Sequence, residues 1–145
     1  KNTSNPLIIA PDKGAVHRAE IAAKKFNLEY DYLIKERDRV TGEVSIKPKE
    51  VSVKDKTVVI IDDIISTGGT IVEASRFLYK LGAKEVYVCS THGLLIGNAI
   101  ERILDSGVKK IITANTLGIK HENPRIEYVD IIPYVASILK NSLLK

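Results

Sequence analysis

The sequence predicts an α/β protein in three layers, with a mostly parallel sheet covered by helices on both faces. Short apolar runs, typical of strands, alternate with segments whose apolar residues recur at spacings of three and four, typical of helices. The connections between these segments are short, as in βαβ units. The chain of 145 residues is long enough for a self-sufficient core, so we expect residues 1–145 to form a single domain.

The first βαβ unit lies at the start of the chain. Leu7–Ala10 is a short apolar strand that ends in the turn sequence PDKG. A helix follows through Phe26, and Leu28–Ile34 is the next strand. One face of that helix carries the apolar residues Val16, Ala19, Ala23 and Phe26.

A second unit begins with a run of β-branched residues. Thr57–Ile61 is short and apolar, which suits a strand buried on both faces of a parallel sheet. The helix over Ile71–Leu81 carries an apolar stripe and ends at Gly82. The remaining strands are expected at Glu85–Cys89, Lys109–Ala114 and Ile126–Val129, and the remaining helices at Ile96–Ser106 and Ile131–Leu144.

One long segment interrupts this alternation. Lys35–Lys56 is rich in charged residues and contains only fragments of β alternation. A solvated hairpin is the favoured interpretation of Val44–Val53. For the first part of the segment we expect a lid, because long charged loops beside a ligand-binding edge often close over a substrate. Such a lid would bring Lys35 and Arg37 over a phosphate chain.

The most informative stretch is TVVIIDDIISTGGT, which spans residues 57–70. Asp62 and Asp63 follow the predicted strand, and open α/β sheets bind ligands at the carboxyl ends of their strands. Because carboxylates only accept hydrogen bonds, a pair of sugar hydroxyls is a natural partner for them. The turn and the helix start that follow supply the candidate phosphate-binding residues Ser66, Thr67, Gly68, Gly69 and Thr70.

The chemistry of this turn suits an anion. Glycines let the backbone approach a phosphate closely, hydroxyls donate hydrogen bonds, and a helix N-terminus offers unpaired N–H groups. A sugar-binding carboxylate pair beside a phosphate-binding turn predicts a ribose phosphate site. The alternative is that the aspartates cap a helix and the glycines form an ordinary turn. The sequence contains neither the P-loop motif of NTPases nor a dinucleotide-binding glycine fingerprint.

Composition limits the other function classes. The net charge is +4 with scattered lysines, and the chain has two Phe and no Trp, so we expect no nucleic-acid partner. No apolar run is long enough to span a bilayer, and we expect no membrane partner and a cytoplasmic location. The lone Cys89 is expected to be a buried thiol. The sequence contains no methionine, which suggests that the chain is part of a longer protein.

Four segments together resemble a known family. VVIIDDIISTGGT is similar to the phosphoribosyl-diphosphate-binding signature of type I phosphoribosyltransferase folds. The further segments APDKGAVHRA, IKER and CSTHG occur in the expected order and at the expected distances. The four motifs resemble the C-terminal half of the ribose-phosphate pyrophosphokinases, also called phosphoribosyl-pyrophosphate synthetases. The similarity extends from about residue 6 to the end of the chain.

The resemblance implies an activity in nucleotide biosynthesis. A diphosphoryl group would move from ATP to the 1-hydroxyl of ribose 5-phosphate, giving phosphoribosyl diphosphate and AMP. By position, Asp62 and Asp63 would hold the ribose hydroxyls, and residues 66–70 would bind the 5-phosphate. Lys35 matches the family's catalytic lysine, and Arg37 matches its partner arginine at the substrate.

The same resemblance implies a magnesium cofactor. Asp12 matches an aspartate associated with the Mg²⁺ that accompanies ATP. A single carboxylate is chemically reasonable, because Mg²⁺ is usually held by one or two carboxylates together with substrate phosphates. No cluster of His and Cys suggests zinc. His92 could contact a ligand after its strand, but a structural role is favoured.

Two departures from the family pattern bear on these expectations. Ser66 stands where many members have an aspartate, which puts an acidic role at this position in doubt but not phosphate binding. The family's N-terminal domain, which carries much of the ATP recognition, lies outside this chain. We therefore expect the chain to need its own N-terminal domain and a symmetric homo-oligomer, and to be weakly active or inactive alone.

Two alternatives remain. A purine or pyrimidine salvage phosphoribosyltransferase would share the paired aspartates and the phosphate-binding turn, but it would have a hood for a nucleobase and no need for Lys35 and Arg37. A non-catalytic, regulatory relative of the synthetase would be expected to have lost functional loop residues. In this sequence Lys35, Arg37, Asp62, Asp63 and residues 67–70 are intact.

Overall fold

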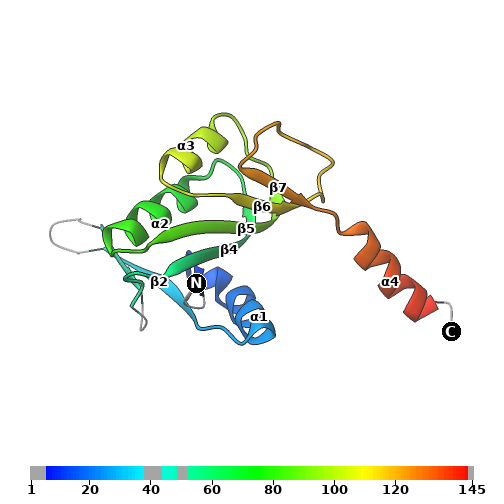
Figure 1. Cartoon of the computed structure of the whole chain (residues 1–145), viewed down its shortest axis with the longest axis horizontal. Coiled ribbons are helices and arrows are strands. Elements are labelled where there is room, and N and C mark those ends of the chain that lie inside the picture. Colours follow the sequence, from blue (N-terminus) through cyan, green and yellow to red (C-terminus); the bar gives the residue numbers. More distant parts are fainter. Residues whose placement is uncertain (1–5, 38–43, 49–51, 144–145) are drawn as a thin grey trace.

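The computed structural model of the chain describes residues 6–37, 44–48 and 52–143; for residues 35–37 and 44–47 it describes the backbone alone. Their strands form one seven-stranded sheet in the order β3-β2-β1-β4-β5-β6-β7 (Figure 1). Neighbouring strands are parallel except for β2 and β3, which pair antiparallel. The strands are β1 (Leu7–Ala10), β2 (Tyr30–Arg37), β3 (Val44–Pro48), β4 (Thr57–Ile65), β5 (Glu85–Gly93), β6 (Ile111–Ala114) and β7 (Ile126–Val129).

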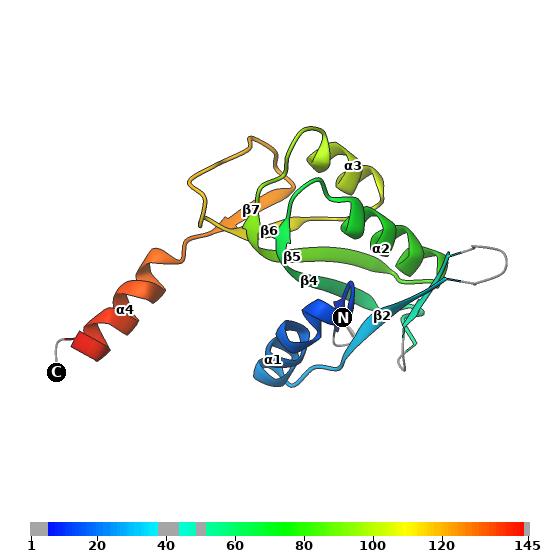
Figure 2. The ribbon, with the colours of Figure 1, turned by 180° about the vertical axis from the view of Figure 1, so that it is seen from behind.

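Helices cover both faces of this sheet, as predicted. In both views, α1 lies on one side of the sheet while α2 and α3 lie on the other (Figures 1 and 2). The predicted α/β fold in three layers is therefore confirmed. The helices are α1 (Val16–Phe26), α2 (Gly69–Lys80), α3 (Ala99–Asp105) and α4 (Ile132–Leu143), and a short 3-10 helix, η1 (Lys13–Ala15), precedes α1.

The larger hydrophobic core lies between the sheet and the α2/α3 layer. Val58 and Ile60 of β4 are fully buried there against residues such as Leu78 of α2 and Ile103 of α3. Each such side chain contributes about 1.5–3 kcal/mol by leaving water. The turn that joins β4 to α2 is therefore held at both ends by elements that are anchored in this core.

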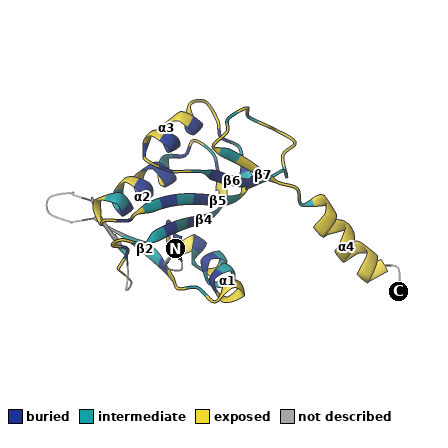
Figure 3. Ribbon diagram, in the orientation of Figure 1, coloured by how far each residue is buried: buried dark blue, intermediate teal, exposed yellow. Residues whose placement is uncertain are grey.

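The opposite face is packed differently. Here the small buried residues Ala15 of η1 and Ala19 and Ala23 of α1 cluster with Ile8 and Ala10 of β1, so the helix can lie close to the sheet. The buried side of α1 faces the sheet (Figure 3). Cys89 of β5 is only half-buried, not buried as expected. Its pKa is raised, first by burial and then by the charge of Glu127.

Two central strands are longer than their sequence patterns predict. β4 continues from Ile61 to Ile65, and β5 continues from Cys89 to Gly93. The reason is that the two strands keep pairing in parallel to the Ile65–Gly93 register pair, and backbone hydrogen bonds tolerate polar side chains. Asp62 and Asp63 therefore lie within β4, near its carboxyl end, and not after it.

The charged segment forms a hairpin over the residues that the structure describes. β3 pairs antiparallel with the end of β2, so the first residues of the predicted hairpin Val44–Val53 do lie in a hairpin, but their partner is β2. The prediction of a solvated segment is wrong at its far end, because Val53 is buried in the larger core. The strand predicted to end at Ile34 continues to Arg37, so Lys35 and Arg37 lie in β2 and not in a loop, and their backbones pair with Ile46 and Val44. The middle of the predicted lid, residues 38–43, lies outside the described residues.

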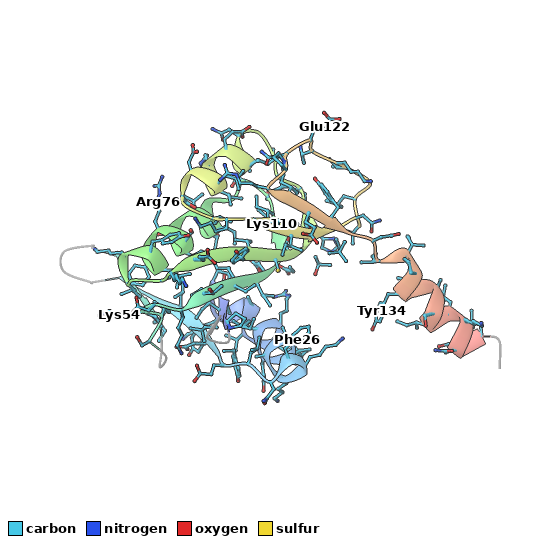
Figure 4. The ribbon with its side chains drawn as sticks, in the orientation of Figure 1. Phe26, Lys54, Arg76, Lys110, Glu122 and Tyr134 are labelled. Atoms are coloured by element: carbon cyan, nitrogen blue, oxygen red, sulfur yellow. The ribbon has the colours of Figure 1, made fainter. Side chains whose placement is uncertain are left out.

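The last helix forms where it was predicted but does not close over the sheet. α4 has no buried residue and extends away from the sheet (Figures 1 and 3). Tyr134, which is 70% exposed, projects freely from it (Figure 4). Within the described part of the chain, no helix combines the length and apolar character required to traverse a bilayer.

Candidate ribose phosphate site

The turn between β4 and α2 encloses a cavity of about 230 Å³ at the carboxyl edge of the sheet. It lies at the N-terminus of α2, whose N-cap residue Gly68 provides no side-chain hydrogen bond. The first N–H groups of a helix have no partner within the helix and favour an anion. The cavity is lined by Asp62, Ile64, Ile65, Ser66, Thr67, Gly68, Gly69, Thr70 and Ile71.

Gly68 is required by both its conformation and its surroundings. Its φ of 76° lies in the left-handed region, which residues other than glycine rarely adopt. A Cβ on Gly68 would lie 2.7 Å from Cδ1 of Ile103 on α3. Gly69 differs, because a Cβ there would have no neighbour within 4 Å. Close packing of the turn on α3 thus explains the first glycine, and the second leaves open space at the cavity.

A polar contact also connects this turn to α3. Nη1 of Arg102 donates a hydrogen bond to the carbonyl oxygen of Thr67 at 3.4 Å. The turn is therefore bound to α3 through both the Gly68–Ile103 contact and this hydrogen bond. Such a preformed turn costs little ordering entropy when an anion binds.

Asp62 joins the sugar-binding and phosphate-binding parts of the predicted site. Asp62 lines the same cavity as the turn. Its Oδ1 accepts a hydrogen bond from the backbone N–H of Asp63 at 2.9 Å. Burial raises the pKa of Asp62 to about 6, and interaction with the carboxyls of Asp63 and Asp12 adds to this rise. A carboxyl with this pKa is mostly ionised at pH 7 and can accept hydrogen bonds from hydroxyls.

Asp63 is engaged on the opposite side, toward α1. Its Oδ2 forms an ion pair with Nη2 of Arg18. Desolvation opposes ionisation of Asp63, but the hydrogen bond with the Asp62 carboxyl and the charge of Arg18 together lower its pKa. The two adjacent carboxyls thus have pKa values shifted in opposite directions.

Arg18 is the site residue that the sequence reasoning missed. Its second guanidinium nitrogen, Nη1, donates to the carbonyl oxygen of Gly14 at 3.1 Å. The residue lies within the segment APDKGAVHRA, so a signal was present in the sequence. Only the packing of α1 beside β4 reveals that it pairs with Asp63, 45 residues further along the chain.

Asp12 stands at the end of β1, on the same edge of the sheet. Its Oδ1 accepts hydrogen bonds from the backbone N–H groups of Gly14 at 2.7 Å and Ala15 at 3.2 Å, so it caps η1. The charge of Asp12 contributes to the raised pKa of Asp62, which indicates that the two carboxyls are electrostatically coupled.

The donor set at this edge is compatible with Mg²⁺. Asp12 offers hard oxygen ligands, and no group of three or more His, Cys, Asp or Glu side chains gathers as a metal site within the described residues. A complete protein cage is not required, because Mg²⁺ commonly retains waters and is shared with substrate phosphates. Asp12 is therefore a suitable single protein ligand.

The strand register brings Lys35 to the same edge. Asp31 of β2, Ile9 of β1 and Ile60 of β4 are aligned across the sheet. Lys35 and Ile64 lie beyond this paired region, toward the carboxyl ends of the parallel strands β2 and β4. Side chains of Lys35 and Arg37 lie outside what the structure describes, so their catalytic roles remain predictions.

His92 has a structural partner. Its Nδ1 lies 2.8 Å from Oγ1 of Thr116, and that hydroxyl donates to the carbonyl oxygen of Thr91 at 3.1 Å. The contact supports the structural role favoured for His92.

Comparison with known proteins agrees with this geometry. Residues 1–123 match the phosphoribosyl transferase domain. The chain belongs to this family. It is 45% identical over 137 residues to the ribose-phosphate pyrophosphokinase of Sulfurisphaera tokodaii, in an alignment that covers 94% of this chain and 46% of the relative. The chain thus spans about half the length of the curated relatives it matches.

Solved structures show the same fold for this phosphoribosyl transferase domain. Phosphoribosylpyrophosphate synthetase from Mycobacterium smegmatis superimposes with a TM-score of 0.82 at 32% identity, covering 94% of this chain and 44% of that chain. Adenine phosphoribosyl transferase from Trypanosoma brucei gives a TM-score of 0.62 at 18% identity, covering 95% and 70%, which indicates a shared fold only. The predicted type I phosphoribosyltransferase-like fold and the resemblance to the pyrophosphokinases are both confirmed.

Proposed function

We propose that the complete protein is a ribose-phosphate diphosphokinase, which transfers a diphosphoryl group from ATP to the 1-hydroxyl of ribose 5-phosphate. The products would be phosphoribosyl diphosphate and AMP. The observation that carries this proposal is the position of Asp62 on the wall of the cavity formed by the β4–α2 turn. A carboxylate acceptor for sugar hydroxyls and a helix N-terminus for a phosphate lie in one hollow, as ribose 5-phosphate requires.

In this proposal, residues 66–70 bind the 5-phosphate through backbone N–H groups and hydroxyls. Asp62 and Asp63 accept hydrogen bonds from the ribose hydroxyls. Ser66 contributes a hydroxyl where many family members have a carboxylate, so the turn carries less negative charge next to the phosphate. Binding would leave the 1-hydroxyl free at the open edge of the sheet.

Catalysis would depend mainly on positioning and charge neutralisation, because phosphoryl transfer offers the protein little covalent chemistry. The mobile ammonium group of Lys35 would stabilise the negative charge that develops on the transferred group. The planar guanidinium of Arg37 would hold a phosphate. Asp12 would hold the magnesium ion together with substrate phosphates. When bound, Mg²⁺ neutralises phosphate charge and makes the phosphorus more electrophilic.

The remaining partners would be ATP, an N-terminal domain of the same protein and further copies in a homo-oligomer. Two features support a domain partner: the chain spans about half the length of its relatives, and α4 is entirely without buried residues. The exposed apolar side chains of α4 include Ile132, Tyr134, Val135, Ile138 and Leu139. A cytoplasmic location belongs to the same proposal.

Binding and turnover separate this function from its alternatives. Isothermal titration calorimetry should show that the chain of residues 1–145 binds ribose 5-phosphate, and an AMP-release assay should show little product from ATP. The complete protein should release AMP only when ribose 5-phosphate is present. An Arg76→Ala variant provides a matched control, because this exposed side chain points away from the sheet (Figure 4).

The contrary results are equally specific. Full turnover by residues 1–145 would contradict the need for a second domain. Pyrophosphate release from phosphoribosyl diphosphate and a nucleobase, without AMP formation from ATP, would identify a salvage phosphoribosyltransferase. Binding of ribose 5-phosphate without any turnover by the complete protein would identify a regulatory relative.

A further inference from the structure

One guanidinium joins two parts of the site that are distant in sequence. Nη2 of Arg18 pairs with Oδ2 of Asp63 on β4, and Nη1 donates to the carbonyl oxygen of Gly14 in the turn after β1. The N–H of Gly14 in turn donates to Oδ1 of Asp12 at 2.7 Å. A continuous chain of polar contacts therefore runs from the candidate metal ligand to the second sugar-binding carboxylate.

The geometry of Arg18 is suited to this task. The guanidinium is planar and has donors in a fixed fork, so two partners held by one fork have a defined separation. Gly14 is four residues before Arg18, which places its carbonyl one helical turn back along the chain. One arm of the fork is thus set by the local helix and the other by the packing of α1 on the sheet.

Stability does not account for this arrangement. The side chains of Arg18 and Asp63 are 37% and 46% exposed, and half-exposed ion pairs of this kind contribute little to folding. The alanines of α1 that pack on β1 already hold the helix in place. What the ion pair does determine is the direction of the Asp63 carboxylate and its charge, both of which matter to a bound sugar.

We propose that Arg18 is a positioning residue, which fixes the Asp63 carboxylate relative to Asp62 and to the Asp12 turn and thereby supports ribose binding. This inference rests on the proposed function. It assigns Arg18 a role through Asp63 and the Gly14 carbonyl, the two groups that its guanidinium contacts. Among the side chains that the structure describes, the charged groups that act on Asp63 are Arg18 from α1 and Asp62 from β4, and the charge of Asp12 acts on Asp62.

Kinetics of the complete protein test the proposal. Arg18→Ala should raise the KM for ribose 5-phosphate by about tenfold, as loss of a supporting contact commonly does, with a smaller change in the KM for ATP. Arg18→Lys should recover part of this loss, since an ammonium supplies the charge but not the two-armed fork. Arg76→Ala, which removes an exposed arginine of α2, should remain within about twofold of wild type.

A second measurement needs no substrate. The carboxyl carbon of Asp63 can be titrated by NMR in wild-type protein and in Arg18→Ala, and the pKa of Asp63 should rise when the guanidinium is removed. Thermal unfolding should shift by only a few degrees, which separates positioning from a general loss of structure. If the wild-type protein fails to make AMP but the Asp63 titration shifts as expected, the proposed function fails while the Arg18–Asp63 coupling stands.

Three results would overturn the proposal. An unchanged KM for ribose 5-phosphate in Arg18→Ala would show that Asp63 does not need its partner. A rise confined to the KM for ATP would make Arg18 a ligand of the nucleotide. An unshifted Asp63 titration would show that the ion pair does not form in solution.

Discussion

The two flanks of the candidate site are constructed on different principles. On one flank, the β4–α2 turn is packed against α3, and Gly68 has no room for a side chain beside Ile103. On the other flank, Asp63 is held by Arg18 through a half-exposed ion pair. The first flank depends on the same buried contacts as folding, whereas the second depends on charge and hydrogen bonds at the surface. Mutations should therefore affect stability on the first flank and binding or catalysis on the second.

The largest effect is expected from Gly68→Ala. Left-handed backbone costs alanine about 1–2 kcal/mol, and overpacking against Ile103 adds about 1–3 kcal/mol. Together they should lower the free energy of unfolding, measured by urea denaturation, by about 2–5 kcal/mol. The matched control is Gly69→Ala, which should leave it unchanged or raise it by about 0.5–1 kcal/mol. Equal destabilisation by both variants would remove the packing argument for this flank.

Lys35→Ala changes a residue of β2 that belongs to neither flank, and here function should fall without loss of structure. In the complete protein, kcat should decrease about a hundredfold, or roughly 3 kcal/mol, because the lost charge acts mainly in the transition state. Lys35→Arg should recover only part of the rate, because a planar guanidinium adjusts less well than an ammonium group as the negative charge shifts between oxygens. Steady-state kinetics with the exposed Lys80→Ala as control measure both. Near-normal kcat in Lys35→Ala would leave β2 and β3 as a solvated hairpin without a catalytic role.

Asp62 lies between the two flanks, and the Asp62→Ala variant should bind substrate more weakly. A carboxylate that accepts hydrogen bonds from the sugar hydroxyls in both the ground state and the transition state stabilises both equally, so its removal mainly raises KM. The KM for ribose 5-phosphate should rise by the equivalent of about 1.5–3 kcal/mol, the range for hydrogen bonds to a charged group. Asp105→Ala, an exposed carboxylate on α3, should not change it. A fall in kcat at constant KM would instead assign Asp62 a role in the chemical step.

The smallest expected effect is a pH dependence of ribose 5-phosphate binding. Because the pKa of Asp62 is raised to about 6, its carboxyl is an anionic acceptor above pH 6 and gains a proton as the pH falls through this value. Affinity measured by calorimetry should therefore decrease below pH 6. The phosphate of the ligand also titrates near pH 6, and Asp62→Asn corrects for this, because it retains the ligand's titration but lacks the carboxyl. Identical pH profiles for the two proteins would show that Asp62 does not control binding.

The sequence was most informative where local chemistry decides structure. The turn at residues 66–70 and the start of α2 near Thr70 follow from residue types in a short window, and both are observed. Prediction was weaker at the ends of strands. The polar residues Asp62 in β4 and Ser90 in β5 suggested that these strands had ended. Both strands continue, because their backbone N–H and C=O groups form hydrogen bonds with each other.

Some features were absent from any local pattern. α4 has the apolar periodicity of a packed helix, but periodicity alone does not specify which surface covers it. The different needs of Gly68 and Gly69 depend on the position of Ile103, 35 residues after the first glycine. The lid predicted around Lys35 remains a prediction, since its central residues lie outside the described part of the chain.

By itself, the sequence determined the order of strands and helices, the position of the turn proposed to bind phosphate and the chemical types of the candidate site residues. The periodicity of apolar residues, β-branching and turn-forming glycines act over a few residues, so they can be read along the chain. The tertiary structure alone decided that Arg18 meets Asp63, that Asp62 shares a cavity with the turn, and that the two carboxyls have opposite pKa shifts. These depend on how α1 and the sheet pack together, because burial and the distances between charges arise only when remote segments are brought side by side.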